Sequence, residues 1–162
     1  MIEDVYYLNN SYPMPKVGLG VYKITEGEME TSIEAALAAG YRAFDTAYFY
    51  KNEIALGNAL KHSDIPREDL FITSKLWNDY QGYDKTIEYF TKSIENLGTD
   101  YLDLFLIHWP CEENDLFIES YKAMEKLYEE GWVRAIGVCN FKQHHLERLM
   151  EETDVVPAVN QI

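Results

Sequence analysis

The sequence places a polar or reactive side chain at the end of each of five short apolar runs. These side chains follow one another at intervals of 30, 33, 32 and 21 residues, and three of the four intervals match a strand–helix unit of about 30 residues. If each run is a strand of one parallel sheet, the five side chains lie at the same edge of that sheet. They are Asp45, Lys75, His108, Asn140 and Gln161.

Tyr50, Lys75 and Asp45 are residue types that together can donate a proton to an oxygen atom. A tyrosine hydroxyl has an ordinary pKa near 10, so it is a poor acid at neutral pH unless a nearby cation stabilises its anion. Lys75 could supply that cation, and Asp45 could keep the ammonium charged and oriented. His108 could hold a carbonyl oxygen in line with the Tyr50 proton. This set suits protonation of an oxygen while a hydride arrives from elsewhere, which is carbonyl reduction or its reverse.

Hydride delivery requires a group that the sequence does not contain. Side chains do not transfer hydride, so this chemistry implies a nicotinamide cofactor. The amides of Asn140 and Gln161 can each donate and accept hydrogen bonds, which suits a grip on the nicotinamide carboxamide. Taken singly, an aspartate after a strand is usually a turn residue, a lysine there is usually solvated, and His108 could be a core imidazole. Only their occurrence at successive strand ends favours a site.

The apolar runs and the segments between them predict alternating strands and helices. Three intervening segments have apolar residues at helical spacing and end at Gly40, Gly98 and Gly131. A glycine there is a helix stop signal, because glycine adopts the left-handed cap conformation without strain. Asn52 and Asp84 are expected to cap the second and third helices. The expected strands are residues 16–20, 41–44, 70–74, 102–107, 135–138 and 157–162, and a preceding hairpin is expected over residues 5–8 and 14–16.

This alternation predicts an α/β fold with a parallel sheet, either open and doubly wound or closed as a (β/α)8 barrel of TIM type. A barrel brings all strand ends to one mouth, whereas an open sheet spreads them along a line. The five strand-end residues therefore favour the barrel. A full barrel has eight units and about 250 residues, but only six strands are expected here. We expect one domain over residues 1–162 that holds the N-terminal part of the barrel and lacks its C-terminal β/α units.

Composition narrows the classes of function. The chain has 162 residues, 47% of them hydrophobic, and a formal net charge of −14. That charge opposes binding to nucleic acid and to anionic membranes. No apolar run is long enough to span a membrane, the first residues do not resemble a signal peptide, and the two cysteines, Cys111 and Cys139, give no disulfide framework. We therefore expect a cytoplasmic protein.

Other site patterns in the sequence are weak. Gly18 and Gly20 lack the third glycine of a Rossmann phosphate turn. His144 and His145 are adjacent, so their side chains are expected to diverge on a helix, and neither has a histidine partner four residues away. We therefore expect no metal site. The fourth strand ends in a histidine rather than a carboxylate, which argues against a glycosidase on the same barrel.

Several long motifs resemble those of the aldo-keto reductase family. Residues 40–47 (GYRAFDTA), followed by Tyr50, resemble its first signature, which continues through residues 52–53 and 56–57. Later motifs of the family are matched in order and spacing by residues 72–77 (ITSKLW), 100–104, 108–110 and 136–141 (IGVCNF), while residues 18–23 and 160–162 resemble its first and sixth strands. The resemblance covers nearly the whole chain.

The resemblance implies an oxidoreductase that reduces aldehydes or ketones to alcohols on a (β/α)8 barrel. Its implied cofactor is NADPH, with NADH as the rarer alternative. By residue-to-residue match, Tyr50 is the general acid, Lys75 and Asp45 tune it, and His108 orients the substrate. The implied cofactor-binding residues are Gly20, Val21, Tyr22, Asp45, Cys139, Asn140 and Gln161, and the implied substrate-binding residues are Tyr22, His108 and Trp109.

Three departures from the family pattern leave two functions open. Cys139 stands where most relatives have serine, and Tyr22 stands where many have tryptophan. The family's loops after strands seven and eight, which bind the pyrophosphate and adenine ribose, have no counterpart in the 162 residues. The first hypothesis is an NAD(P)H-dependent carbonyl reductase acting on a small carbonyl substrate. The alternative is an inactive partial barrel that associates with itself or another protein through exposed strand edges.

Overall fold

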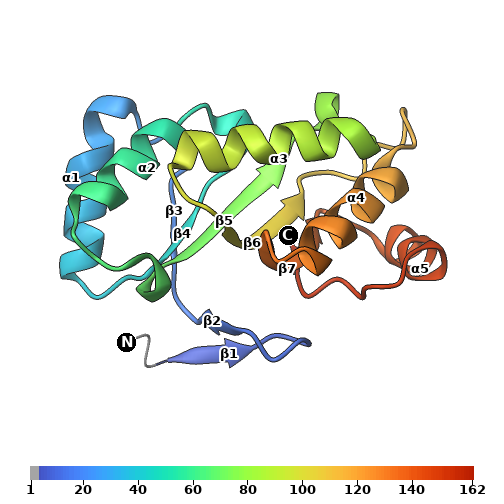
Figure 1. Ribbon diagram of the computed structural model, residues 1–162, viewed down its shortest axis with the longest axis horizontal. Helices are drawn as coiled ribbons and strands as arrows, with labels where there is room; N and C mark the ends of the chain where they lie inside the picture. Colours follow the sequence, from blue (N-terminus) through green and yellow to red (C-terminus); the bar gives the residue numbers. More distant parts are fainter. Residues whose placement is uncertain (1–3) are drawn as a thin grey trace.

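The computed structural model describes residues 4–162, and its centre is one parallel sheet of six strands. The strands lie side by side in the order in which they occur along the chain, and the sheet is curled (Figure 1). The predicted α/β fold with six parallel strands is confirmed. The strands are β3 (Leu19–Gly20), β4 (Ala43–Asp45), β5 (Phe71–Leu76), β6 (Leu102–Ile107), β7 (Val133–Cys139) and β8 (Asn160–Gln161).

Five helices connect these strands and cover the outer side of the sheet. Helices α1 to α4 contact one another in sequence, and Figure 1 shows the row of α1, α2 and α3 lying over the strands. The helices are α1 (Glu26–Ala38), α2 (Glu53–His62), α3 (Tyr83–Leu97), α4 (Phe117–Glu129) and α5 (Gln143–Glu152). Short 3-10 turns lie at η1 (Tyr48–Tyr50), η2 (Arg67–Asp69) and η3 (Asn78–Tyr80).

The helix ends test the predicted stop and start signals. Gly40, Gly98 and Gly131 have φ values of 93°, 63° and 81°, so each adopts the left-handed region as expected. Asn52 is the N-cap residue of α2, but the predicted cap at Asp84 is wrong. Helix α3 begins one residue earlier, at Tyr83, because Gly82 with φ 111° makes the turn into it. Asp84 instead lies in the first turn of α3.

The core has two layers that follow from the alternation of side chains along each strand. Phe105 and Ile107 of β6 belong to the large cluster beneath the helices, whereas Leu104 and Leu106 belong to a smaller cluster on the inner face of the sheet. Ala43 of β4 also lies in this inner cluster. A strand residue two positions from an inner-cluster residue therefore points inward as well.

A hairpin packs against the inner cluster. Its strands are β1 (Val5–Tyr7) and β2 (Pro13–Pro15), which confirms the predicted hairpin, and Figure 1 shows it on the side of the sheet away from the helices. The hydroxyl of Tyr12 donates a hydrogen bond of 2.6 Å to Asp103, which Arg67 also contacts at 2.7 Å. The hairpin is thus fastened near the amino ends of β5 and β6.

The outermost strands are much shorter than predicted. Residues 16–20 and 157–162 were expected to be strands, but the regular strands β3 and β8 have only two residues each, although Ala158 and Val159 also make backbone hydrogen bonds with β7. Residues 102–107 are a strand over their whole predicted length. β3 and β8 are the edge strands of the sheet, so each is hydrogen-bonded to a neighbouring strand on one side only.

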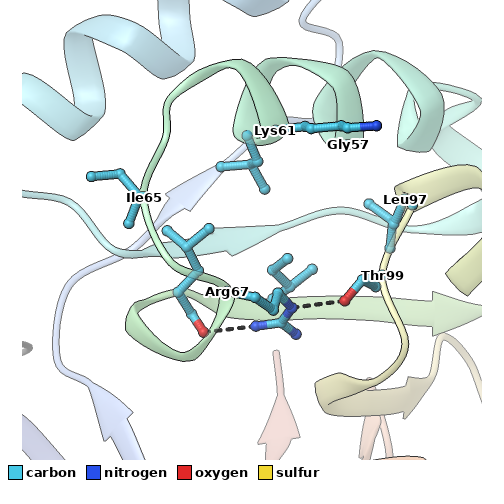
Figure 2. Close-up of a pocket in the computed structure, with 10 residues that line it drawn as sticks. Gly57, Lys61, Ile65, Arg67, Leu97 and Thr99 are labelled. Carbon is cyan, nitrogen blue, oxygen red and sulfur yellow. Dashed lines mark hydrogen bonds between the residues drawn. The ribbon is translucent and has the colours of Figure 1, made fainter.

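A cavity of about 230 Å³ lies where α2 and α3 approach the start of β5. Figure 2 shows Arg67 crossing its floor, where the guanidinium donates hydrogen bonds to Thr99 (2.8 Å) and to the carbonyl of Leu70 (2.9 Å). None of the sequence-predicted site residues lines this cavity. Within residues 4–162, no helix has both the length and the apolar character needed to cross a membrane.

Helix α2 approaches the end of α3 so closely at Gly57 that no side chain fits there. A Cβ atom there would lie 2.3 Å from the carbonyl oxygen of Leu97, so Gly57→Ala should lower the free energy of unfolding by about 1–3 kcal/mol. Gly27→Ala, where a Cβ meets nothing within 4 Å, should leave stability unchanged or raise it by up to about 1 kcal/mol. Chemical denaturation measures both, and equal effects of the two variants would contradict this account of the α2–α3 contact.

Candidate functional site

The inner face of the sheet carries the predicted site residues at its carboxyl edge. Asp45 follows inward-facing Ala43 by two positions, and in β7 the inner-cluster residues Ala135 and Cys139 are four positions apart, which is also an even spacing. Lys75 lies four positions after inner-cluster Phe71. Because side chains alternate along each strand, polar side chains from neighbouring strands lie together on the inner face of the sheet at its carboxyl edge, which we call the rim.

Lys75 forms the charged centre of this rim. Its side chain is only 1% exposed, and its ammonium makes an ion pair with Asp45. The carbonyl oxygen of Thr46 accepts a second hydrogen bond from Lys75 Nζ at 2.9 Å. Gln161 Nε2 donates to the other carboxylate oxygen of Asp45 at 3.0 Å. A buried ammonium is tolerated only when it is paired and hydrogen-bonded, and these contacts meet that requirement.

Tyr50 lies beside this ion pair, at the end of η1. Lys75 Nζ lies over its ring, 5.2 Å from the centroid, and the His108 ring meets it edge to face at 5.8 Å. Among residues 4–162 the Tyr50 hydroxyl makes no hydrogen bond with Lys75 or His108. Burial and then the negative charge of Asp45 raise the pKa of Tyr50 to about 12. The net pKa of Tyr50 is therefore raised rather than lowered beside Lys75, and the phenol is protonated at neutral pH.

His108 follows β6 and is held in its neutral form. Burial and then the positive charge of Lys75 lower the pKa of His108 to about 4. Its ring packs edge to face with Trp77 at 5.3 Å, and its Nδ1 has no hydrogen-bond partner among the described residues. A neutral imidazole on the rim can donate a hydrogen bond to an oxygen without adding a second cation beside Lys75.

The residues expected to hold a nicotinamide lie on the same rim. Asn140 Nδ2 donates to the His108 carbonyl at 3.0 Å, and Cys139 Sγ lies 3.7 Å from Gln161 Oε1. Burial raises the pKa of Cys139 to about 12, so its thiol stays protonated and can act as a donor. The backbone N–H of Val21 donates to the Asp45 carbonyl at 3.0 Å.

The remaining predicted residues lie around the opening. Tyr22 is 55% exposed and stacks obliquely on Tyr50 with ring centroids 4.8 Å apart. Trp109 is 45% exposed, directly after His108. Gly20 pairs with Asp45 in the strand register, and both line a cavity of about 390 Å³ between the hairpin and strands β3 to β5. The roles assigned to all of these residues stay predictions.

Sequence reasoning missed four buried polar residues that surround the site. Thr46, Asn52, Glu53 and Ser74 are all buried, and each makes a side-chain hydrogen bond. Ser74 and Lys75 are adjacent on β5, so they face opposite sides of the sheet. Ser74, a polar residue on the helix-facing side of a buried strand, was the signal in the sequence that could have revealed this network of hydrogen bonds.

The expectation that His144 and His145 diverge is wrong. Their ring centroids are 3.9 Å apart, and Nε2 of each contacts the same oxygen of Glu112, at 3.2 Å for His144. These three side chains could supply metal ligands. However, His145 Nδ1 accepts the backbone N–H of Lys142 at 2.9 Å, so the neutral ring carries its proton on Nε2. That proton opposes metal binding through Nε2 and suits donation to Glu112.

Comparison with known proteins places the chain among reductases. A family model described as the Aldo/keto reductase family matches residues 16–162. The chain is 51% identical over 155 residues to an aldo-keto reductase of Mycolicibacterium smegmatis and 49% identical over 162 residues to a glyoxal reductase of Bacillus subtilis. It is 48% identical over 158 residues to a methylglyoxal reductase of Escherichia coli O157:H7. These alignments cover 96% to 99% of the chain but only 56% to 58% of the relatives' own length.

Solved structures agree with this assignment of fold. The chain matches the crystal structure of an aldo/keto reductase from Brucella melitensis with a TM-score of 0.94 and 48% identity, covering 98% of this chain and 62% of the other. It matches a variant of Gox0644 in complex with NADPH with a TM-score of 0.92 and 42% identity, covering 98% and 57%. The predicted fold, (β/α)8 type with six strands in this chain, is confirmed.

The neutral state of His108 should make stability depend on pH. The pKa of His108 is about 4 in the folded chain, whereas an unperturbed histidine in the unfolded chain has a pKa of 6.5. The unfolded state therefore binds more protons than the folded state between these two pH values. The stability that His108 contributes is therefore present above pH 6.5 and is lost as the pH falls toward 4. Between pH 7 and pH 5 the wild type should lose about 2 kcal/mol relative to His108→Gln.

Urea denaturation at the two pH values measures this difference. His62→Gln, which removes an exposed histidine, is the matched control and should give no comparable change. An equal stability gap between wild type and His108→Gln at both pH values would contradict the neutral assignment.

Proposed function

The chain belongs to the aldo-keto reductase family, and from that premise we propose that it acts in the NAD(P)H-dependent reduction of small aldehydes and ketones. The observation that carries this proposal is the meeting of four groups at one rim. The Lys75–Asp45 ion pair and the neutral ring of His108 come from successive strand ends, and the protonated phenol of Tyr50 comes from the turn after β4. Because the chain spans little more than half of its curated relatives, the activity of the whole protein is part of the proposal.

In the proposed mechanism, Tyr50 donates its hydroxyl proton to the carbonyl oxygen of the substrate. The developing phenolate is stabilised by the Lys75 ammonium, which Asp45 and the Thr46 carbonyl hold in place. Neutral His108 donates a hydrogen bond to the same substrate oxygen and fixes its orientation. The nicotinamide, when bound, supplies the hydride to the carbonyl carbon. Proton transfer by a positioned acid contributes about 10²–10⁴ in rate.

The residues at the rim fit the nicotinamide end of such a cofactor. Asn140 and Gln161 present amides, and Cys139 presents a protonated thiol, so donors and acceptors for a carboxamide lie together. The backbone from Gly20 to Tyr22 lies on the other side of Asp45. NADPH is the proposed cofactor, since a related structure contains it. NADH is the alternative.

Small dicarbonyl compounds are the proposed substrate class. Relatives at 49% and 48% identity are a glyoxal reductase and a methylglyoxal reductase. The exposed rings of Tyr22 and Trp109 stand beside Tyr50 and His108 and would form apolar walls for a short substrate. The free cysteines Cys111 and Cys139 suit a reducing compartment, so we place the protein in the cytoplasm.

A second candidate function is association without catalysis. Strands β3 and β8 each pair on one side only, so both offer unpaired backbone groups to another chain. The exposed Val17 lies next to β3 and adds apolar surface there. In this alternative the chain pairs with a second copy through these edges and binds NADPH weakly or not at all.

Replacement of the proposed acid should remove most turnover. Tyr50→Phe keeps the ring contacts with Lys75 and His108 but has no proton to donate, so kcat for methylglyoxal reduction with NADPH should fall by about 10²–10⁴. Tyr48→Phe, in the same turn but packed against Tyr80 and Tyr89, is the matched control and should retain activity. Full activity of Tyr50→Phe would reject the role proposed for this hydroxyl.

NADPH binding separates the two candidate functions. Fluorescence titration of the purified 162-residue chain should give a Kd on the order of micromolar if the rim binds the nicotinamide. Sedimentation of the same sample measures self-association. Concentration-dependent dimers that do not bind NADPH would favour association and contradict the reductase proposal.

A further inference from the structure

Two buried polar residues follow the turn that carries Tyr50. Asn52 is 6% exposed and Glu53 is 2% exposed, although both belong to residue types that usually face solvent. They are separated from Tyr50 by Lys51 alone, which adopts the left-handed conformation with φ 56°. The contacts of Asn52 and Glu53 therefore bear on where the Tyr50 turn lies.

Asn52 links this turn to the residues that directly follow β3 and β4. Its Oδ1 accepts a hydrogen bond of 2.8 Å from the hydroxyl of Thr46, and its Nδ2 donates one of 2.9 Å to the carbonyl of Val21. Asn52 is the N-cap residue of α2, yet its side chain makes no capping hydrogen bond. Its amide therefore serves the contacts with Thr46 and Val21 rather than the usual role of an N-cap.

Glu53 links the same turn to β5 and α3. Its Oε1 accepts a hydrogen bond of 2.6 Å from the hydroxyl of Ser74, and its Oε2 accepts one of 3.0 Å from Asn96 Nδ2. Ser74 is fully buried, so without Glu53 its hydroxyl loses this partner. Both carboxyl oxygens are thus committed to fixed partners.

The partners of Asn52 and Glu53 are sequence neighbours of the site residues. Thr46 follows Asp45, Ser74 precedes Lys75, and Val21 precedes Tyr22. The two residues therefore connect the Tyr50 turn to the three backbone segments that carry Asp45, Lys75 and Tyr22.

We infer that Asn52 and Glu53 are positioning residues that fix the Tyr50 ring relative to Asp45 and Lys75. They touch none of the groups that would react, and they act through Thr46, Val21 and Ser74. The functional meaning of this inference rests on the proposed reductase function. The position of the Tyr50 ring, however, can be measured without catalysis.

The test measures the ionisation of Tyr50 in the 162-residue chain. Tyrosine labelled with ¹³C at Cζ gives an NMR titration for each phenol, and the Tyr50→Phe variant assigns the signal of Tyr50. The pKa of Tyr50 is raised to about 12 by burial and by Asp45. A loosened turn exposes the phenol, so Glu53→Ala, Asn52→Ala and Ser74→Ala should each lower this pKa by about 1 unit toward 10.

Two further variants separate positioning from general loss of stability. Glu53→Gln retains an acceptor for Ser74, and the Asn96 amide can turn to accept from the new donor, so the wild-type pKa should be kept. Tyr12→Phe removes the 2.6 Å hydrogen bond to Asp103, far from the rim, and serves as a matched control for lost stability. The double variant Glu53→Ala/Ser74→Ala should shift the pKa no more than Glu53→Ala alone, because Glu53→Ala already removes the contact with Ser74.

The outcomes decide the inference in either direction. A Tyr50 pKa in Glu53→Ala that matches the value in Tyr12→Phe would overturn it, as would additive shifts in the double variant. If the wild type reduces methylglyoxal, Glu53→Ala and Ser74→Ala should lower kcat about tenfold with little change in KM, and Glu53→Gln should restore it. A wild type without activity would refute the proposed function while the titration still tests the positioning.

Discussion

The buried ion pair between Lys75 and Asp45 is the constraint around which the rest of the site is arranged. An ammonium with 1% exposure must be paired and hydrogen-bonded, or the chain would not fold with its charge intact. The pairing of β4 with β5 brings the two strand ends together, and the Thr46 carbonyl completes the shell of the ammonium. Gln161, from the far side of the sheet, reaches the other oxygen of Asp45, which requires the sheet to curl.

The same alternation of side chains builds the core and the rim. Inward residues in the amino halves of the strands include apolar Ala43 and Phe71, whereas the inward positions at the ends of β4 and β5 are polar Asp45 and Lys75. The outward residues pack against helices, with Ser74 as the exception that Glu53 satisfies. A shift of β5 by one residue would place Lys75 among the helices and Ser74 on the rim, so the apolar pattern that fixes the register also fixes the site.

The elements that sequence reasoning predicted well are those with a local cause. The glycine helix stops, the hairpin and β6 follow from backbone preference or a fully apolar run. The predictions that were wrong concern features that depend on contacts between segments far apart in the sequence. The outer strands are short because pairing on one side does not hold their full length. His144 and His145 lie together because Glu112, more than 30 residues away, contacts both.

The acidity of Tyr50 shows why residue type alone does not define a catalytic group. The sequence suggested that Lys75 lowers the pKa of this phenol, but in the folded chain burial of the hydroxyl and then the negative charge of Asp45 raise it. The phenol is therefore a weak acid at rest. The raised pKa already includes the interaction of the phenolate with Lys75, so in the folded chain that interaction does not outweigh burial and the charge of Asp45. A phenol with a raised pKa keeps its proton until a substrate oxygen is in place, and the proposed role of Tyr50 as the acid then depends on how its ring lies relative to Lys75 and Asp45.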